Sequence, residues 1–356
     1  MPPIKCIFCL ETGLGTEEHV FPLAIGGSLT LWRVCGPCNS RLGSAADSAL
    51  SNHLLVALSR ARLRLPGNSG AVPEPLLEML KDGHLASDPE QRIRPTIAAD
   101  GRFEPILLYK KEPLMLGEQE AERITIDARE GRQRLPAIIA RNRKRRGLKT
   151  LQPAEMQAEV DRLIETREKL DDSTVQGSFL LDLNPPARAL LKIAYELAFL
   201  WLGEAYLDDP VAAALRAVVL DGKDPVEAGV QCRCVVGVAE PLALWRGAKD
   251  SHVAFAKSAG GRVELALKVF DAFSAVVVVS EDAGRYFARG QDWPGRFLRI
   301  DAATGERKDE SYGAGLRSEV RALRQRYRRI AALASTSPLA MAVRPGPRKY
   351  RGGLPC

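Results

Sequence analysis

Four cysteines near the amino terminus are spaced as metal ligands. Cys6 and Cys9 form one C-x-x-C pair, and after 25 intervening residues Cys35 and Cys38 form a second. Each pair turns the chain tightly enough for both sulfurs to face one ion, and two such pairs match a tetrahedral four-thiolate zinc site. Because four thiolates leave no open position for a substrate, the predicted zinc is structural. The alternative interpretation is four unrelated buried cysteines.

A second group of residues with chemical potential lies between and just after these pairs. The motif E-H-x-x-P begins at Glu18, a glycine pair follows at Gly26, and Asn39 comes directly after Cys38. In this order and combination, the residues resemble the HNH endonuclease family, in particular its four-cysteine branch, which includes the junction-resolving endonucleases of phages. The resemblance covers about residues 4–55. It implies a ββα-metal fold, in which a zinc ribbon pins the ends of a β-hairpin and the helix that follows.

The resemblance also implies a role for each matching residue. His19 matches the general base, Glu18 the acidic ligand of a catalytic Mg²⁺ or Mn²⁺, and Asn39 the residue that ligates or braces that cation. A neutral imidazole suits the activation of water near pH 7, and a hard divalent cation stabilises charge on the phosphorane and the leaving oxygen. Neighbouring side chains on a strand point to opposite faces, so we expect a local distortion or a division of roles at these positions. The alternative is an exposed polar pair on a zinc ribbon.

The third ligand of the cation is open. Many HNH proteins carry a histidine in the helix after the asparagine, and the candidates in this sequence are Asp47 and His53. In the four-cysteine branch the asparagine itself completes the site, so neither candidate is required. We expect Asp47 to cap or brace its helix and His53 to pack among neighbouring leucines.

The charge balance permits a polyanionic partner. Lys and Arg number 51 against 44 Asp and Glu, a net charge of +7. One basic run is predicted to contact the phosphates of DNA or RNA, with a solvated loop as the alternative. Four arginines at helical spacing would present a second positive face, unless an acidic partner within the chain covers it. The run comprises Arg141, Arg143, Lys144, Arg145 and Arg146, and the stripe comprises Arg317, Arg321, Arg324 and Arg328.

The remaining cysteines and histidines favour structural roles. Cys232 and Cys234 share one face of a predicted strand and are interpreted as buried thiols. His84 and His252 each lie alone in the sequence. No Walker loop, dinucleotide fingerprint or kinase motif is present, which argues against a built-in ATPase.

Composition narrows the class of protein. With 356 residues, 46% hydrophobic and 27% charged, the chain can bury a sizeable core and fold as two or three units. The most apolar long stretch, 187–206, is interrupted by Lys192, Glu196 and Glu204, which argues against a membrane span. The first residues lack an apolar signal-peptide core, so we expect a cytoplasmic protein.

The periodicity predicts an α+β fold. Helices are expected from Pro153, over 186–206, from Pro210 and over 317–329, and strands over 232–238, 253–257, 263–270 and 275–280. Gly260 and Gly261 predict a hairpin turn, and short strands are expected within 101–140. The expected domains are an HNH module with structural zinc over 1–60, a linker over 61–95 with a short helix at 75–81, a mixed helical and antiparallel-sheet domain for substrate or partner recognition over 96–330, and a disordered tail over 331–356.

These patterns predict a metal-dependent HNH endonuclease that hydrolyses DNA phosphodiesters. Defence against mobile DNA and DNA processing are settings that such an activity would fit. The alternative is a non-cleaving zinc-ribbon protein that binds DNA or acts as a scaffold. Glu18, His19 and Asn39 are all present, which favours the nuclease, because a scaffold would not need all three. A protein partner or a homo-oligomer is compatible with either function.

Overall fold

The protein combines helices with antiparallel sheets, and the predicted α+β class is confirmed. The computed structural model describes residues 3–67, 70–97, 103–129, 131–163, 174–177, 184, 186–287 and 293–336. Contacts divide the chain into two units, the first with residues 1–73 and 183–356, the second with residues 74–182. Among the described residues, no helix is long and apolar enough to cross a membrane.

The first unit begins with a β-hairpin followed by helices. Strands β3 (Gly15–His19) and β4 (Thr30–Cys35) pair antiparallel, and the smaller pair β1 (Ile4–Lys5) and β2 (Thr12–Gly13) precedes them along the chain. A short helical turn η1 (Leu23–Ile25) lies in the long connection between β3 and β4. Helix α1 (Gly36–Leu42) starts directly at the end of β4 and continues through η2 (Gly43–Asp47) and α2 (Ser48–Ser51). Helix α3 (Leu54–Leu63) follows after a break at Asn52 and His53. This is the β-hairpin and helix arrangement that the sequence predicts.

The first unit also contains a six-stranded antiparallel sheet. Its order is β11-β14-β13-β12-β15-β16. The strands are β11 (Cys232–Val236), β12 (Ser251–Ala259), β13 (Arg262–Val269), β14 (Phe273–Ser280), β15 (Arg296–Asp301) and β16 (Arg307–Glu310). The first four confirm the predicted strands, and Gly260 and Gly261 both take positive φ in the turn between β12 and β13.

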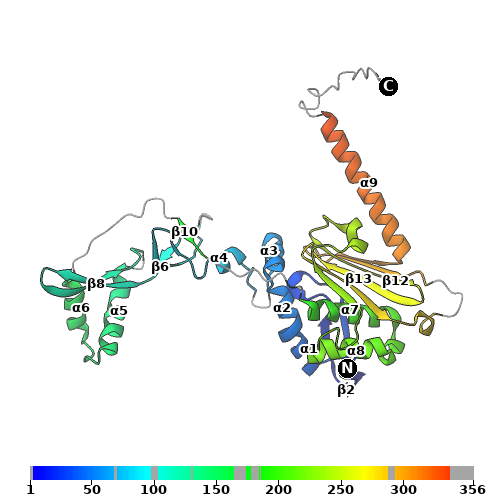
Figure 1. Cartoon of the computed structure of the whole chain (residues 1–356), viewed down its shortest axis with the longest axis horizontal. Coiled ribbons are helices and arrows are strands. Elements are labelled where there is room, and N and C mark those ends of the chain that lie inside the picture. The colour runs from blue at the N-terminus through cyan, green and yellow to red at the C-terminus, as the bar shows by residue number, and fades with distance from the viewer. Residues whose placement is uncertain are drawn as a thin grey trace, which may run out of the picture. The chain divides into compact units, whose positions relative to one another are not determined.

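Two helices link the sheet to the amino-terminal elements. Helices α7 (Ala187–Leu202) and α8 (Pro210–Asp221) contact β14 on one side, while α8 contacts α1 and α7 contacts η2 on the other (Figure 1). Because α7 has protein on several sides, eleven consecutive residues from Ala189 to Phe199 are buried. Buried side chains from Cys6 to Val56 therefore belong to the same hydrophobic core as those of α7 and the sheet.

Short helical turns and one long helix complete the described part of this unit. The turns are η3 (Glu204–Asp208), η4 (Glu240–Trp245) and η5 (Ala283–Arg285), and the long helix is α9 (Tyr312–Thr336). The start of α9 packs on β12 and β15, and a Cβ at Gly315 would collide with the ring of Phe297, so this close approach requires glycine. Arg317, Arg321 and Arg324 are exposed on α9, as the predicted positive face requires.

The described part of the second unit contains two small sheets and three helices. One sheet has the order β10-β5-β6-β7, and β8 pairs with β9 in another. The strands are β5 (His84–Leu85), β6 (Asp88–Arg94), β7 (Ile106–Leu107), β8 (Lys110–Leu116), β9 (Gln119–Thr125) and β10 (Val175–Gln176), and the helices are α4 (Pro75–Met79), α5 (Gly131–Arg145) and α6 (Pro153–Asp161).

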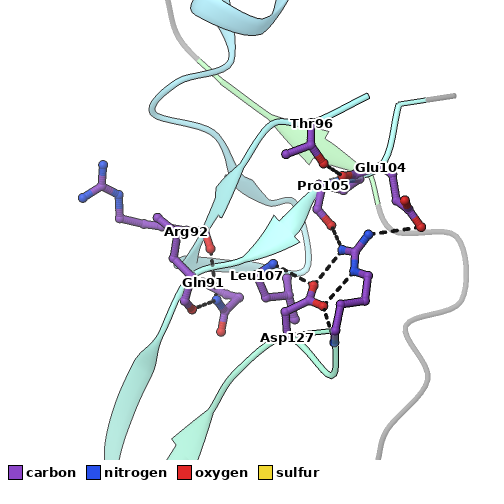
Figure 2. Close-up of polar contacts among 9 residues, drawn as sticks. Gln91, Arg92, Thr96, Glu104, Pro105, Leu107 and Asp127 are labelled. Atoms are coloured by element: carbon purple, nitrogen blue, oxygen red, sulfur yellow. Dashed lines mark hydrogen bonds and ion pairs between the residues drawn. The ribbon is translucent and has the colours of Figure 1, made fainter. Parts of the chain in front are cut away.

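A buried aspartate holds strand β7 together with the segment that follows β9. Figure 2 shows the carboxylate of Asp127, which accepts a hydrogen bond of 3.1 Å from the backbone N–H of Leu107. The guanidinium of Arg129 donates to both oxygens of Asp127 and lowers the pKa of that carboxyl to about 2. Arg129 also donates to the carbonyl of Pro105, so one ion pair fixes two chain segments.

The division into units differs from the expected domain boundaries. The chain leaves the first unit at Pro73 and returns to it at Leu183, so the expected range 96–330 falls on both units. The expected linker 61–95 contains the end of α3 and the strand β6 besides the predicted short helix, α4. The physical reason is that the amino-terminal module buries its apolar side against α7 and the sheet rather than closing a core of its own.

The structure also shows the secondary structure of the basic run and of the carboxy-terminal tail. The run lies in helix α5 up to Arg145, and not in the solvated loop that was the alternative. Leu135, Ile138 and Ile139 give this helix one apolar side. Strands β15 and β16 were not predicted. The expected tail starts inside α9, which continues to Thr336, and residues 337–356 lie outside the described part.

Candidate functional site

The four cysteines of the two C-x-x-C pairs converge on one point. Their sulfurs all lie within 4.8 Å of one another, and the Sγ atoms of Cys9 and Cys35 are 3.7 Å apart. A tetrahedral zinc ion with bonds of about 2.3 Å requires sulfurs about 3.8 Å apart, so the set fits zinc closely. The backbone N–H of Cys35 donates to Cys6 Sγ at 3.4 Å. Burial opposes the ionisation of Cys6, but backbone hydrogen bonds outweigh it and lower the pKa of this thiol. The lower pKa favours the thiolate form that a metal needs.

The pairing of β3 with β4 is distorted beside the Glu18-His19 pair. The register shifts between Thr16 and Glu18, so that two residues of β4, Trp32 and Arg33, lie opposite Glu17 in a β-bulge. After the bulge, Glu18 pairs with Leu31 and His19 with Thr30. Glu18 is buried with 2% of its surface exposed, whereas His19 is half-buried. The expected local distortion is therefore present.

Asn39 braces this bulge from helix α1. Its side-chain amide donates to the carbonyl of Glu17 at 2.8 Å and to Thr16 Oγ1 at 3.0 Å. Both contacts use the NH₂ group, so the amide oxygen remains as a potential metal ligand.

The glycine pair fixes the connection that follows His19. Gly26 has φ +83° and ends η1, and a Cβ at this position would collide with the backbone of Ala302. A Cβ at Gly27 would collide with the carbonyl of Phe21. His252 on β12 stacks on Phe21 and bonds the carbonyl of Ile25 at 2.8 Å. Burial lowers the pKa of His252 to about 4, so the ring is neutral and donates through Nε2.

A buried lysine from helix α7 lies beneath the site. Lys192 has no exposed surface, and its ammonium pairs with Glu18, with Asp47 at 3.2 Å and with Glu196 at 3.6 Å. The same ammonium donates to the carbonyl of His19 at 2.8 Å. Lys192 therefore ties α7 to β3 and to the end of η2.

This cluster carries more negative than positive charge. Burial raises the pKa of Glu18 and of Asp47 against the opposing effect of Lys192, and it raises the pKa of Glu196 well above its usual value. Neither oxygen of Glu196 has a hydrogen-bond partner, and Asp47 Oδ1 has none. If all three carboxylates are ionised, they carry two more negative charges than the ammonium of Lys192 balances, and one divalent cation would neutralise this excess. The donor set is composed of oxygens, which hard cations prefer, so these residues fit such an ion.

The site opens into a pocket of about 540 Å³. Its lining includes Glu17, Glu18, His19, Asn39, Asp47 and Arg60. Of the two candidates for a third ligand, the structure brings Asp47 to this pocket, and His53 lies elsewhere. His53 caps the start of α3 by accepting the N–H of Leu55 and packs edge-on against Phe273.

The other candidate residues do not line the pocket. Arg141, Arg143, Lys144 and Arg145 are on α5, and Arg146 follows it, where it pairs with Glu122. Cys232 and Cys234 lie on β11 with partly buried thiols, and His84 lies on β5.

Three residues of the site were missed in the sequence: Arg60, Lys192 and Glu196. Lys192 and Glu196 are four residues apart within an otherwise apolar helix, a spacing that places both on one face. The sequence analysis used them only as an argument against a membrane span. Two opposite charges at this spacing inside a buried helix are a signal of a buried ion pair.

Comparison with known proteins identifies the class of the amino-terminal module. Residues 6–55 match the family model described as HNH endonuclease. No curated protein and no solved structure matches the chain. The amino-terminal segment is thus an HNH nuclease-family domain with a cysteine cluster that could hold zinc.

Proposed function

We propose that this protein is a metal-dependent endonuclease that hydrolyses DNA phosphodiester bonds in the cytoplasm. The observation that carries the proposal is the pocket that brings His19, Glu18, Asn39 and Asp47 together from β3, α1 and η2. The family match over residues 6–55 supports phosphodiester chemistry for this pocket.

The residues divide the catalytic work between them. His19 is half-buried on the pocket wall, where its imidazole accepts a proton from water as the water attacks phosphorus. Glu18, Asp47 and the amide oxygen of Asn39 would hold one Mg²⁺ or Mn²⁺, which stabilises negative charge on the phosphate and the leaving oxygen. Asn39 also locks the bulge at Glu17, and Lys192 locks Glu18 and Asp47, so both act as positioning residues.

We assign DNA contact outside the pocket to helix α5. Arg141, Lys144 and Arg145 are exposed, and no acidic residue occurs in this helix. Clustered exposed cations attract the phosphate backbone without regard to base sequence. Arg143 and Arg146 also belong to the basic run, but Arg143 Nε donates to the carbonyl of Lys149 and Arg146 is paired with Glu122.

One observation favours a second candidate function, a zinc-ribbon DNA-binding or scaffold protein without cleavage. The Lys192 ammonium already bridges Glu18 and Asp47, the two carboxylates that would hold the catalytic cation. An internal cation of this kind can stabilise the carboxylates in a protein that binds no divalent ion.

Plasmid cleavage separates these two functions. Purified full-length protein is incubated with supercoiled plasmid in Mg²⁺ or Mn²⁺, with and without chelator. The nuclease predicts nicked or linear product that depends on the divalent ion. Intact plasmid under every divalent metal, with zinc retained by the protein, would favour the scaffold.

A further inference from the structure

Arg60 is a buried cation that pairs with no carboxylate of the described residues. It lies on α3 with 4% of its surface exposed. The other buried cations of the described chain, Lys192 and Lys268, each contact carboxylates. Arg60 makes one hydrogen bond, from Nη1 to the carbonyl of Ser51 at 3.0 Å, and its buried Nε has no partner.

An unpaired buried guanidinium is costly. Burial removes water from the charge, and this lowers the pKa of Arg60 with no opposing effect from a carboxylate. The cost of such a charge is recovered only when an anion and hydrogen-bond acceptors approach it. The contact with Ser51 satisfies one of the five N–H groups of the side chain.

The pocket is where that anion would come from. Arg60 lines the same pocket as His19, Asn39 and Asp47, and Ser48 and Asn52 stand beside it in the lining. A guanidinium fork is suited to two phosphate oxygens at once. Glu18 and Asp47, the carboxylates of the site, lie on β3 and η2 and offer DNA no positive charge. Arg60 on α3 supplies that positive charge.

We propose that Arg60 binds a DNA phosphate in this pocket and orients it toward His19, as a substrate-binding residue of the endonuclease. The inference rests on the proposed function and adds the group that recognises the substrate. Ser51 would hold the arginine in place through its carbonyl, while the second amino group is left to bind the phosphate.

The test compares matched variants of the full-length chain. Arg60→Gln removes the charge but keeps a donor for the carbonyl of Ser51, and Arg60→Lys restores the charge without the fork. Arg62→Met is the control, because Arg62 lies on the same helix, is exposed, and already pairs with Asp250. Zinc content and melting temperature establish that each variant is folded.

Two measurements are made on this set. Cleavage by Arg60→Gln should fall by about 10²–10³-fold in kcat/KM, with Arg60→Lys in between and Arg62→Met near the wild type. In a His19→Ala background, binding of a 20-base-pair duplex over a series of KCl concentrations should show a log–log slope shallower by about 0.9 for Arg60→Gln. A purely structural arginine would change the melting temperature and leave this slope unchanged.

The outcomes separate the inference from the proposed function. A folded Arg60→Gln variant that cleaves like the wild type and keeps the full salt slope would overturn the phosphate role of Arg60. If the wild type cleaves no DNA in any divalent metal but Arg60→Gln still flattens the salt slope, the nuclease proposal fails while the phosphate contact stands. If Arg60→Gln does not fold, the Arg60→Lys variant decides, because a folded variant with unchanged kcat/KM contradicts a need for the guanidinium fork.

Discussion

The two charged centres of the amino-terminal module are built in different ways. All four sulfurs of the cysteine cluster come from residues 6–38. Cys6 and Cys9 lie in the turn between β1 and β2, Cys35 ends β4, and Cys38 lies in helix α1. The carboxylate cluster joins Glu18 and Asp47 to Lys192 and Glu196, which lie about 150 residues further along the chain. The first centre is local in sequence, and the second exists only once α7 has docked.

The same helix docks against both centres. Tyr195 of α7 donates to the carbonyl of Ile7 inside the first cysteine pair, and Lys192 donates to the carbonyl of His19. The carboxy-terminal part of the chain therefore supplies structure to the nuclease module itself. A module cut off after residue 60 would lack these contacts and would expose the apolar side that α7 covers.

Loss of a cysteine ligand should have the largest effect. Cys35→Ser removes one thiolate, and structural zinc contributes roughly 10–16 kcal/mol of apparent binding free energy at pH 7 in small modules. This is comparable to the whole stability of about 5–15 kcal/mol of a typical domain. We expect loss of zinc and unfolding of residues 3–63, with a weakened core beneath the sheet. Metal analysis and hydrogen exchange check this, and a variant with full zinc content and native protection would contradict it.

Removal of Lys192 should come next. Lys192→Met leaves Glu18, Asp47 and Glu196 without their cation, and breaking a buried ion pair at one partner costs about 3–5 kcal/mol. The free energy of unfolding, from urea titration, measures this loss. A change within about 1 kcal/mol would mean that the carboxylates do not depend on the ammonium.

Glu196→Gln is the matched control for Lys192→Met, and it should raise the free energy of unfolding where Lys192→Met lowers it. Burial raises the pKa of Glu196 in the folded state, so the folded protein holds its proton more tightly than the unfolded chain does. The stability from this group is present at low pH and is lost as the pH rises through the raised pKa. Glu196→Gln, a neutral isostere, should therefore stabilise the protein at pH 8 without added divalent metal and change little at pH 5.

The structural features that could be predicted from the sequence are those that depend on residues close together in the chain. The cysteine pairs, the hairpin and helix, the strands β11 to β14 and the glycine turn each carry a short-range pattern, and they are present. The expected roles of Asp47 and His53 needed tertiary information, because a carboxylate or an imidazole in a helix can face any of several partners. The return of the chain to the first unit at Leu183 has no local signal. The strands β15 and β16 are short and rich in charge, so their alternation is weak.

The smallest expected effect belongs to helix α5. Replacing Arg141, Lys144 and Arg145 by Gln removes three exposed charges without touching the pocket. The salt dependence of DNA binding should flatten by up to about 2.7 units of log–log slope if each residue contacts one phosphate. Affinity should fall alike for unrelated DNA sequences. An unchanged slope would assign this helix to a plain solvated surface.

The most direct test of the nuclease assignment is the cleavage rate of His19→Ala in Mg²⁺ and in Mn²⁺. Loss of a general base costs about 10²–10⁴-fold in rate, while zinc content and DNA binding should stay as in the wild type, because His19 supplies no thiolate and its side chain is only half-buried. The account predicts a folded, DNA-binding variant that hardly cuts. Cleavage by His19→Ala at the wild-type rate would contradict it and would place any nuclease activity outside this pocket.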